Sequence, residues 1–565
     1  MLEQDVGPTA SAVEEPSPRG VAVLGAAFAL AACGGGGGDS SGTAAEPAAA
    51  APSAPVMVVP ASLTPAQAGR FLAQATMGAT RGDIDRVIAR GYEGWITDQF
   101  ATPRGTSHWD WLVAGGYLAG GSGANASGWD ASIWRALIAE PDQLRQRVGQ
   151  ALLDTLVVSV DQIGVGWRSF AMAAYMDLLN EHAFGNYRDL LGAITTNAAM
   201  ASFLTYLGNR RANPQRGSVP DENYARELMQ LFTIGLQQLE PDGRPRLNGG
   251  QPIETYTSAD VSQLARVFTG LTLASTDGST PDRLRQPLVV NTGLNETGAS
   301  GFLGTTVSGG GMAAVNAALD AIFAHPNVPP FVSANLIRRL TTSNPSPAYV
   351  GRVAAAFANN GQGVRGDMRA TIRAILLDPE ARGEAALTDP RAGRLRDPVL
   401  RFTNWARACR ATATEGKWSV GNLQDATSQL AQSPGHAPSV FNFFRPGYTP
   451  PSSPIAAAGL VAPELQITTE QSVVGYVNRM YAVVANGIGD VKADYADLRA
   501  KAADTAALVD EVNLLLAAGQ LSPATLSTMR GAVDAIQPTA ANGLINRVGT
   551  AVILCLAAPD YLTLR

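Results

Sequence analysis

Apolar residues recur at helical spacing through most of the chain after residue 60. In the stretch 223–232, a step of about 100° per residue gathers the apolar side chains on one side of a helix and the polar ones opposite. Comparable patterns occur in 143–160, 169–180 and much of 471–565. Strand-like runs are few, and two of them are predicted to form a small hairpin or an irregular arm, namely 285–291 and 305–311. The pattern predicts an all-α protein, with one large helical unit over residues 63–565.

Helix-starting signals support this prediction. Thr80 and Asp83 are spaced as a capping box, and so are Thr257 and Asp260 in the sequence T-S-A-D. In such a box, each side chain accepts a hydrogen bond from the other residue's backbone N–H. Three further starts carry proline at the first helical position, after Thr64, Ser346 and Ser522.

The N-terminal region has a different composition. An apolar run over 21–32 follows Arg19 and ends in Leu-Ala-Ala-Cys at Cys33. The run is too short for a spanning helix, and its end resembles a bacterial lipobox, in which the cysteine is lipidated. We therefore expect a leader over 1–33, a flexible Gly/Ser/Ala/Pro tether over 34–62, and an exported periplasmic or cell-surface lipoprotein that contacts the membrane only through its lipid anchor.

Composition narrows the classes of function. The net charge is −6, charged residues make up 16% of the chain, and no long Lys/Arg run is present, which argues against a nucleic-acid partner. The three cysteines and four histidines are scattered, without a CxxC or HExxH motif. No cofactor and no metal site are predicted.

The segment "PDENYARELMQLFTIG", residues 220–235, raises the main question about a site. Glu222 and Arg226 are spaced as a favourable i,i+4 ion pair on the polar side. Glu227 falls at the edge of the apolar face, where a buried carboxylate needs a partner or its pKa rises. A polar connection leads to the helix after Thr257, so an antiparallel arrangement makes Arg266 a candidate partner of Glu227.

The candidate residues divide into two groups. Glu227 and Asp260 are the candidate acid/base residues, although a capping role explains most of Asp260. The candidate binding residues are polar side chains on the recognisable segments, with arginines as an anion clamp: Asn223, Arg226, Arg266, Arg338, Asn344, His325 and His436. A helix-capping and ion-pair lattice is the structural alternative for the 220–235 segment, and an ordinary loop role is the alternative for both histidines.

Five further segments are distinctive, and they are, in chain order, DENYARELMQLFTIG, YTSADVSQLARVFTG, HPNVPPF…LIRRLTTSNPSPAYVGRV, RLRDPVLR and PSVFNFFRPGY. Together they resemble the DUF1800 family of exported bacterial proteins. The resemblance implies one long helical unit and suggests a DUF1501-type exported protein as partner, but it implies no mechanism. Many members carry a histidine and a lysine before an "FLG" element, whereas this chain has "NETGASGFLG" at 295–304.

Three functions remain open at this point. The first is a tethered binding or assembly protein of the cell envelope, which acts with a co-encoded partner. The second is an exported hydrolase with a carboxylate/arginine cleft between the two helices of the 220–271 region. The third, a metal- or cofactor-dependent oxidoreductase, is disfavoured by the small supply of histidine and cysteine.

Overall fold

A computed structural model describes residues 62–119 and 126–565. The leader predicted for 1–33, with Cys33, and the tether up to residue 61 lie outside the described residues. Helices account for 53% and strands for 6% of the structure, so the all-α prediction is confirmed. Within the described ranges, no helix is both long enough and apolar enough to cross a membrane.

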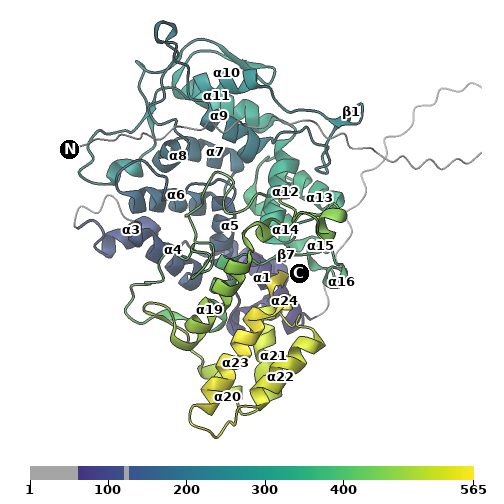
Figure 1. The fold of residues 1–565 in the computed structure, drawn as a ribbon. Coiled ribbons are helices and arrows are strands. Elements are labelled where there is room, and N and C mark those ends of the chain that lie inside the picture. Colours follow the sequence, from purple (N-terminus) through teal and green to yellow (C-terminus); the bar gives the residue numbers. More distant parts are fainter. Residues whose placement is uncertain (1–61, 120–125) are drawn as a thin grey trace, which may run out of the picture. The chain divides into compact units, whose positions relative to one another are not determined.

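The first half of the chain is drawn from purple to teal in Figure 1, and it is mostly helical. These helices are α1 (Pro65–Ala75), α2 (Arg81–Ala101), α3 (His108–Ala114), α4 (Ser127–Ala139), α5 (Gln143–Leu153), α6 (Arg168–His182), α7 (Tyr187–Thr195), α8 (Ala198–Phe203), α9 (Asn223–Glu227) and α10 (Ser258–Val267). Shorter turns are the 3₁₀ helices η1 (Pro214–Arg216) and η3 (Asp282–Leu284) and the π-helix η2 (Leu228–Thr233).

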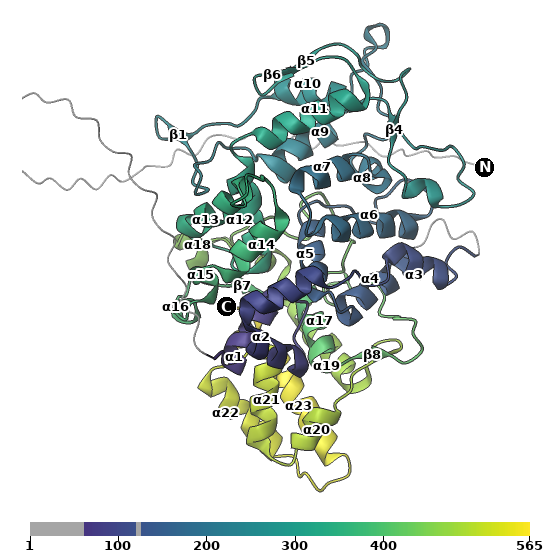
Figure 2. The same ribbon diagram turned by 180° about the vertical axis from the view of Figure 1, so that it is seen from behind.

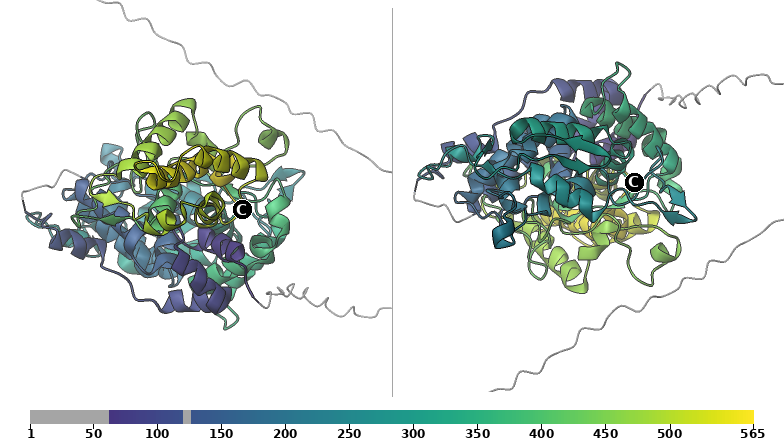
Figure 3. Two further views of the ribbon diagram at one scale, coloured as in Figure 1. Left: turned by 90° about the horizontal axis from the view of Figure 1, so that it is seen from below. Right: turned by 90° about the horizontal axis from the view of Figure 1, so that it is seen from above.

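The second half continues the helical architecture. Its helices are α11 (Gly311–Ala324), α12 (Val328–Leu340), α13 (Pro347–Ala358), α14 (Met368–Leu377), α15 (Pro379–Arg382), α16 (Ala385–Thr388), α17 (Pro398–Ala408), α18 (Pro454–Ala457), η4 (Pro463–Ile467), α19 (Glu470–Asn486), α20 (Ala496–Lys501), α21 (Thr505–Ala517), α22 (Pro523–Asp534), α23 (Gly543–Ala557) and α24 (Pro559–Leu562). In Figures 1 and 2, α20–α23 lie at one end of this unit and α9–α11 at the other. Figure 3 views these two ends in turn.

The strands form five antiparallel two-stranded ladders. The pairs are β1 (Leu247–Asn248) with β2 (Gln251–Pro252), β3 (Leu271–Thr272) with β4 (Val289–Val290), β5 (Ser300–Phe302) with β6 (Thr305–Val307), β7 (Arg394–Leu395) with β10 (Thr563–Leu564), and β8 (Thr412–Ala413) with β9 (Val491–Lys492). Both predicted strand segments are present as β4 and β6. They do not form a hairpin with each other, because β4 pairs with β3 and β6 pairs with β5.

The local helix signals are confirmed. Thr80 and Asp83 form a reciprocal capping box, as do Thr257 and Asp260. The Thr64–Pro65 start likewise opens α1. Each cap satisfies backbone N–H groups that have no partner within the helix, and each contributes about 1 kcal/mol.

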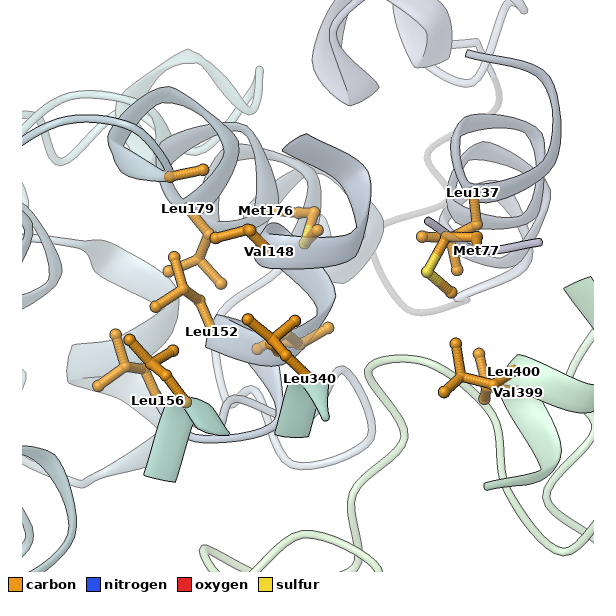
Figure 4. Close-up of a cluster of buried hydrophobic side chains, with 14 of the residues drawn as sticks. Met77, Leu137, Val148, Leu152, Leu156, Met176, Leu179, Leu340, Val399 and Leu400 are labelled. Atoms are coloured by element: carbon orange, nitrogen blue, oxygen red, sulfur yellow. The ribbon is translucent and has the colours of Figure 1, made fainter. Parts of the chain in front are cut away.

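One continuous core runs through the described unit. Figure 4 shows part of it, where Val148 and Leu152 of α5 lie beside Leu179 of α6 and Leu340 of α12. These four side chains are fully buried. Full burial of each such side chain stabilises the fold by about 1.5–3 kcal/mol, so α5 is fixed between α6 and α12. This packing positions the charged C-terminal turn of α12.

Candidate functional site: a cavity beside α12

A cavity of about 850 Å³ lies beside α12, and we call it the α12 cavity. Segments far apart in the sequence line it: 154–155 after α5, 230–239 after α9, one face of α12, 440–449, and 461–464. Leu236, Arg445 and Gly447 are solvent-exposed, so the cavity opens to the surface there. Three of the five segments that carry the family resemblance therefore meet at this cavity.

One face of α12 lines the cavity. Phe331, Asn335 and Arg338 are spaced by four and three residues, which places them on the same side of a helix. Arg338 has no hydrogen bond, ion pair or aromatic contact among the residues that the structure describes, and its Nε atom is buried without a partner. Burial lowers the pKa of Arg338. Arg338 is thus a guanidinium that borders the cavity and is not neutralised by the protein.

The π-helix η2 is the part of the 220–235 segment that reaches the cavity, where it contributes Gln230 and Leu231 to the lining. Its wider turns let the Thr233 hydroxyl donate to the Leu228 carbonyl oxygen at 2.5 Å. The segment then turns at Gly235, whose φ of +70° suits glycine, and a Cβ atom there would lie 2.6 Å from the Phe331 ring. Gly235 therefore permits the close approach of η2 and α12. The π-helix was not predicted from the sequence.

The segment 440–449 supplies an aromatic side of the cavity. It forms no helix in the structure. Phe444 of this segment is fully buried, whereas Arg445 and Gly447 are exposed. The Arg339 guanidinium lies 5.0 Å from the centre of the Phe444 ring, and Ala462 donates to the Tyr448 carbonyl oxygen at 2.9 Å. These contacts hold the segment against α12 and the 461–464 turn.

A buried network of charges borders the cavity through Asp154, Arg339 and Glu464. Arg394 donates to Glu464 at 2.7 Å and to Asp397 at 2.9 Å. Asp154 is buried as well; burial raises the pKa of its carboxyl group, and the positive charge of Arg339 opposes that rise. Arg147 also belongs to this network, whose arginines are Arg147, Arg339 and Arg394. Its acidic side chains are Asp154, Asp397 and Glu464, so the formal charges balance. It does not compensate the charge of Arg338.

Glu227 is buried as predicted, with 7% of its surface exposed. Its Oε2 atom has no hydrogen-bond partner, and burial raises its pKa while the charge of Arg226 opposes the rise. The proposed ion pair with Arg266 is wrong, because Arg266 pairs with Glu296 at 3.8 Å. Glu227 does not line the α12 cavity, although it lies only three residues before Gln230, which does.

The neighbouring candidates have local partners. Arg226 and Glu222 form the predicted ion pair at 3.0 Å on the exposed side of the helix. The Asn223 amide lies near the Thr205 hydroxyl at 3.4 Å. Asp260 caps α10 and also accepts from the backbone N–H of Leu303 at 2.8 Å. Although burial would raise the pKa of Asp260, these hydrogen bonds lower it, which favours a capping carboxylate over an acid/base group.

Two predicted binding residues stabilise connections between segments. Both polar ends of the Asn344 amide bond to the backbone of Val461, each at 2.9 Å, and so tie the end of α12 to the 461–464 turn. His325 accepts from the backbone N–H of Asn327, and burial lowers the pKa of its ring. Neither side chain lines the α12 cavity.

His436 has a charged environment that the sequence did not indicate. Its Nε2 atom lies 2.6 Å from Asp130, and its Nδ1 atom lies 2.9 Å from Asp161. Burial alone would lower the pKa of His436, but the two carboxylates raise it to about 9. At neutral pH this histidine is a buried cation in a three-residue cluster. It does not border the α12 cavity.

A second cavity, of about 550 Å³, lies near α3 and α5. Its polar lining includes Asp142 and Asp177, and burial raises the pKa of each carboxyl group to about 6. Asp177 accepts from the backbone N–H groups of His108 and Trp109, and Asp142 lies 3.3 Å from Arg145. Both carboxylates thus have partners within the protein and help to hold the surrounding helices together. Nowhere in residues 62–119 or 126–565 do three His, Cys, Asp or Glu side chains gather as metal ligands do.

Of the nine candidates, only Arg338 borders the α12 cavity. Asn335 and Arg339 lie on the same helix as Arg338 and also line the cavity, but they were not among the predicted site residues. Asn335 could have been predicted from its spacing, because it lies three positions before Arg338 and therefore on the same face of the helix. No signal in the sequence marks Asp154, whose place depends on packing between α5 and α12.

The fold and the α12 cavity define, over the described residues, a large helical protein with a ligand-sized, partly apolar pocket that is bordered by an arginine without an ion-pair partner. Comparison with protein families matches residues 70–563 to "Protein of unknown function (DUF1800)". The chain therefore belongs to the DUF1800 family. Searches of curated proteins and of solved structures each found no match.

Proposed function

We propose that this protein is an exported, lipid-anchored binding protein of the cell envelope, which holds its ligand in the α12 cavity. The observation that carries the binding role is the cavity itself. Its volume of about 850 Å³ falls in the range of small-molecule sites, roughly 300–1,000 Å³. Such sites combine apolar walls with a few polar groups, as Phe331, Phe444 and Arg338 do here.

A cavity-filling substitution tests the binding role. Asn335→Trp adds bulk on the face of α12 that lines the cavity, whereas Ser527→Trp places the same side chain on an exposed position of α22. Binding of a neutral, environment-sensitive dye to the full chain is measured by fluorescence titration. We expect weaker binding for Asn335→Trp and unchanged binding for Ser527→Trp. Equal binding by all three proteins would contradict a ligand site in this cavity.

Export and anchoring rest on the lipobox-like sequence that ends at Cys33. The test is incorporation of a labelled fatty acid by cells that express the full chain or its Cys33→Ser variant. We expect label and membrane association in the parent and neither in the variant. A parent chain without label contradicts the anchor, whatever the outcome of the dye titration.

The partner in this proposal is a co-encoded DUF1501-type exported protein, as the family resemblance suggests. Co-expression of both chains followed by affinity purification tests it. We expect the two proteins to elute together at a fixed ratio. Separate elution at micromolar concentration contradicts a stable complex.

A hydrolase is the second candidate, and the buried carboxyl of Glu227 favours it. A raised pKa suits a general acid or base, and Glu227 lies beside the α9–η2 junction. However, the arginine clamp is not assembled there, since Arg226 pairs with Glu222 and Arg266 with Glu296. The test is hydrolysis of ester and glycoside substrates by the parent and by Glu227→Gln. Activity in the parent alone, with both proteins folded, would establish this alternative.

A further inference from the structure

Arg338 has a position that packing alone does not explain. It lies on the cavity face of α12, and no carboxylate of the described residues forms an ion pair with it. Taking a guanidinium partly out of water is unfavourable unless a counter-charge or hydrogen-bond acceptor compensates. The neighbouring Arg339 differs, because its side chain donates to the Asp154 carbonyl oxygen at 3.2 Å and contacts the Phe444 ring. A ligand anion would supply what Arg338 lacks.

The surroundings of Arg338 select the kind of anion. Asn335, one turn earlier on the same face, has no side-chain hydrogen bond among the described residues, so its amide is free to donate as well. The planar fork of an arginine matches the paired oxygens of a carboxylate or a phosphate. The charge-balanced network around Arg394 leaves the positive charge of Arg338 in excess at this side of the cavity.

The remainder of the lining is apolar or aromatic. It includes Leu231, Phe331, Phe441 and Phe444. A small inorganic anion would leave this surface in contact with water, whereas a ligand with an apolar part would bury it, at roughly 25 cal/mol per Å² of apolar area. The lining therefore favours a molecule with one charged end and one apolar part.

We infer that the ligand of the α12 cavity is an anionic amphiphile, whose carboxylate or phosphate head is bound by Arg338 and Asn335. Its apolar part lies against the phenylalanine side chains of the cavity. This inference rests on the proposed binding function and names the chemical class of the ligand.

The test compares probes of one chain length and different heads. Dodecanoate, dodecyl phosphate, dodecanol and dodecyltrimethylammonium are titrated into the full chain by calorimetry, below their micelle-forming concentrations, and inorganic phosphate serves as a head without a tail. We expect at least one of the two anions to bind about tenfold or more tightly than dodecanol, because only an anionic head forms a charge-assisted hydrogen bond with Arg338. The two anions distinguish a carboxylate from a phosphate head, and inorganic phosphate alone should not bind measurably.

Variants of Arg338 test whether this residue causes the difference in affinity between the anions and dodecanol. Arg338→Met removes the charge from a side chain of similar length, so the affinity for the anionic probe should fall about tenfold while the affinity for dodecanol stays the same. Arg338→Lys keeps the charge and should retain part of the preference for anions over dodecanol. Arg210→Met is the matched control, since Arg210 is exposed, away from the cavity, and without a side-chain partner in the described structure. Because Arg338 has no protein partner and its burial is unfavourable, its variants should melt at or above the parent's temperature.

The outcomes separate the two claims. Equal affinity for anions and dodecanol, preference for the cationic probe, or an unchanged anion affinity in Arg338→Met each overturns the inferred ligand class but leaves binding in the cavity intact. If no probe binds, or if Asn335→Trp binds every probe as the parent does, the proposed cavity function fails and the inference with it.

Discussion

The Nε2 atom of His436 lies 2.6 Å from an Asp130 carboxylate oxygen, although 306 residues separate the two in the chain. Asp161 holds the other ring nitrogen, so the protonated imidazole donates to two carboxylates. The pKa of His436 is thereby raised to about 9 from an ordinary 6.5. This link joins α4 to the segment that leads into the aromatic side of the α12 cavity.

The first prediction concerns the pH dependence of this link. Because the folded pKa of His436 lies above the unfolded one, its stabilisation is complete below about pH 6.5 and is lost as the pH rises through about 9. His436→Gln should cost on the order of 3 kcal/mol near pH 6 and little above pH 9. Urea unfolding of both proteins across this range measures the difference. A gap that does not depend on pH would show that His436 contributes through packing alone.

The second prediction concerns the buried network of charges that borders the α12 cavity through Glu464. Arg394 bonds to Glu464 and Asp397, so its removal leaves two buried carboxylates without their cation. Arg394→Met should destabilise the fold by about 3–5 kcal/mol, and the double variant with Glu464→Gln should recover part of that loss. Denaturant titration measures both values. Arg391→Met serves as control, because Arg391 is exposed; a comparable loss there would contradict the role assigned to the network.

The third prediction concerns Glu227, whose buried Oε2 atom has no partner. Burial raises its pKa, so ionisation of Glu227 disfavours the folded state above that pKa, and the penalty fades as the pH falls. Glu227→Gln should therefore melt at or above the parent's temperature near pH 8 and like the parent near pH 4. The control Glu222→Gln breaks an exposed pair and should lose a few tenths of a kcal/mol. A clear loss of stability in Glu227→Gln near pH 8 would mean that its carboxylate is paired.

The fourth prediction concerns the turn at Gly235. A methyl group there meets the Phe331 ring at 2.6 Å and a φ of +70°, whereas Gly217 has a similar φ of +64° and open space around it. Gly235→Ala should cost about 1–3 kcal/mol more than Gly217→Ala, since only the first adds a clash. Thermal melting measures the stability, and dye binding to the α12 cavity should weaken in Gly235→Ala alone. Equal losses in the two variants would contradict close packing of Gly235 on α12.

Local features of the fold were predictable from the sequence because their interactions join residues three or four positions apart. The capping box of Thr257 and Asp260 is one example, and the pair of Glu222 and Arg226 is another. The burial of Glu227 followed from its angular position on the helix. These inferences needed no knowledge of the neighbouring elements.

The partner of Arg266 was not predictable in this way. Asn295 donates to the Thr269 carbonyl oxygen at 2.6 Å, and the Glu296 N–H group donates to the Thr269 hydroxyl at 2.8 Å. These bonds return residues 295–296 to the end of α10, where Glu296 takes the position beside Arg266. The α12 cavity escaped prediction for the same reason, since packing of distant segments creates it. Arg338 was selected for its residue type, and only the fold revealed that it borders a cavity.

The contact between α1 and the C-terminal residue has a consequence for how the chain folds. The Arg70 side chain of α1 donates to the Arg565 carbonyl oxygen, a contact between residues 495 positions apart, and to the carbonyl oxygen of Gly383. Contacts of such high sequence separation form slowly, because the chain must close a long loop before they contribute. At a synthesis rate of roughly 5–20 residues per second, at least tens of seconds pass between the synthesis of α1 and that of Arg565. Until then the side of α1 that packs on α21 and on the C-terminal residue stays uncovered, so a chaperone that holds the incomplete chain should limit aggregation.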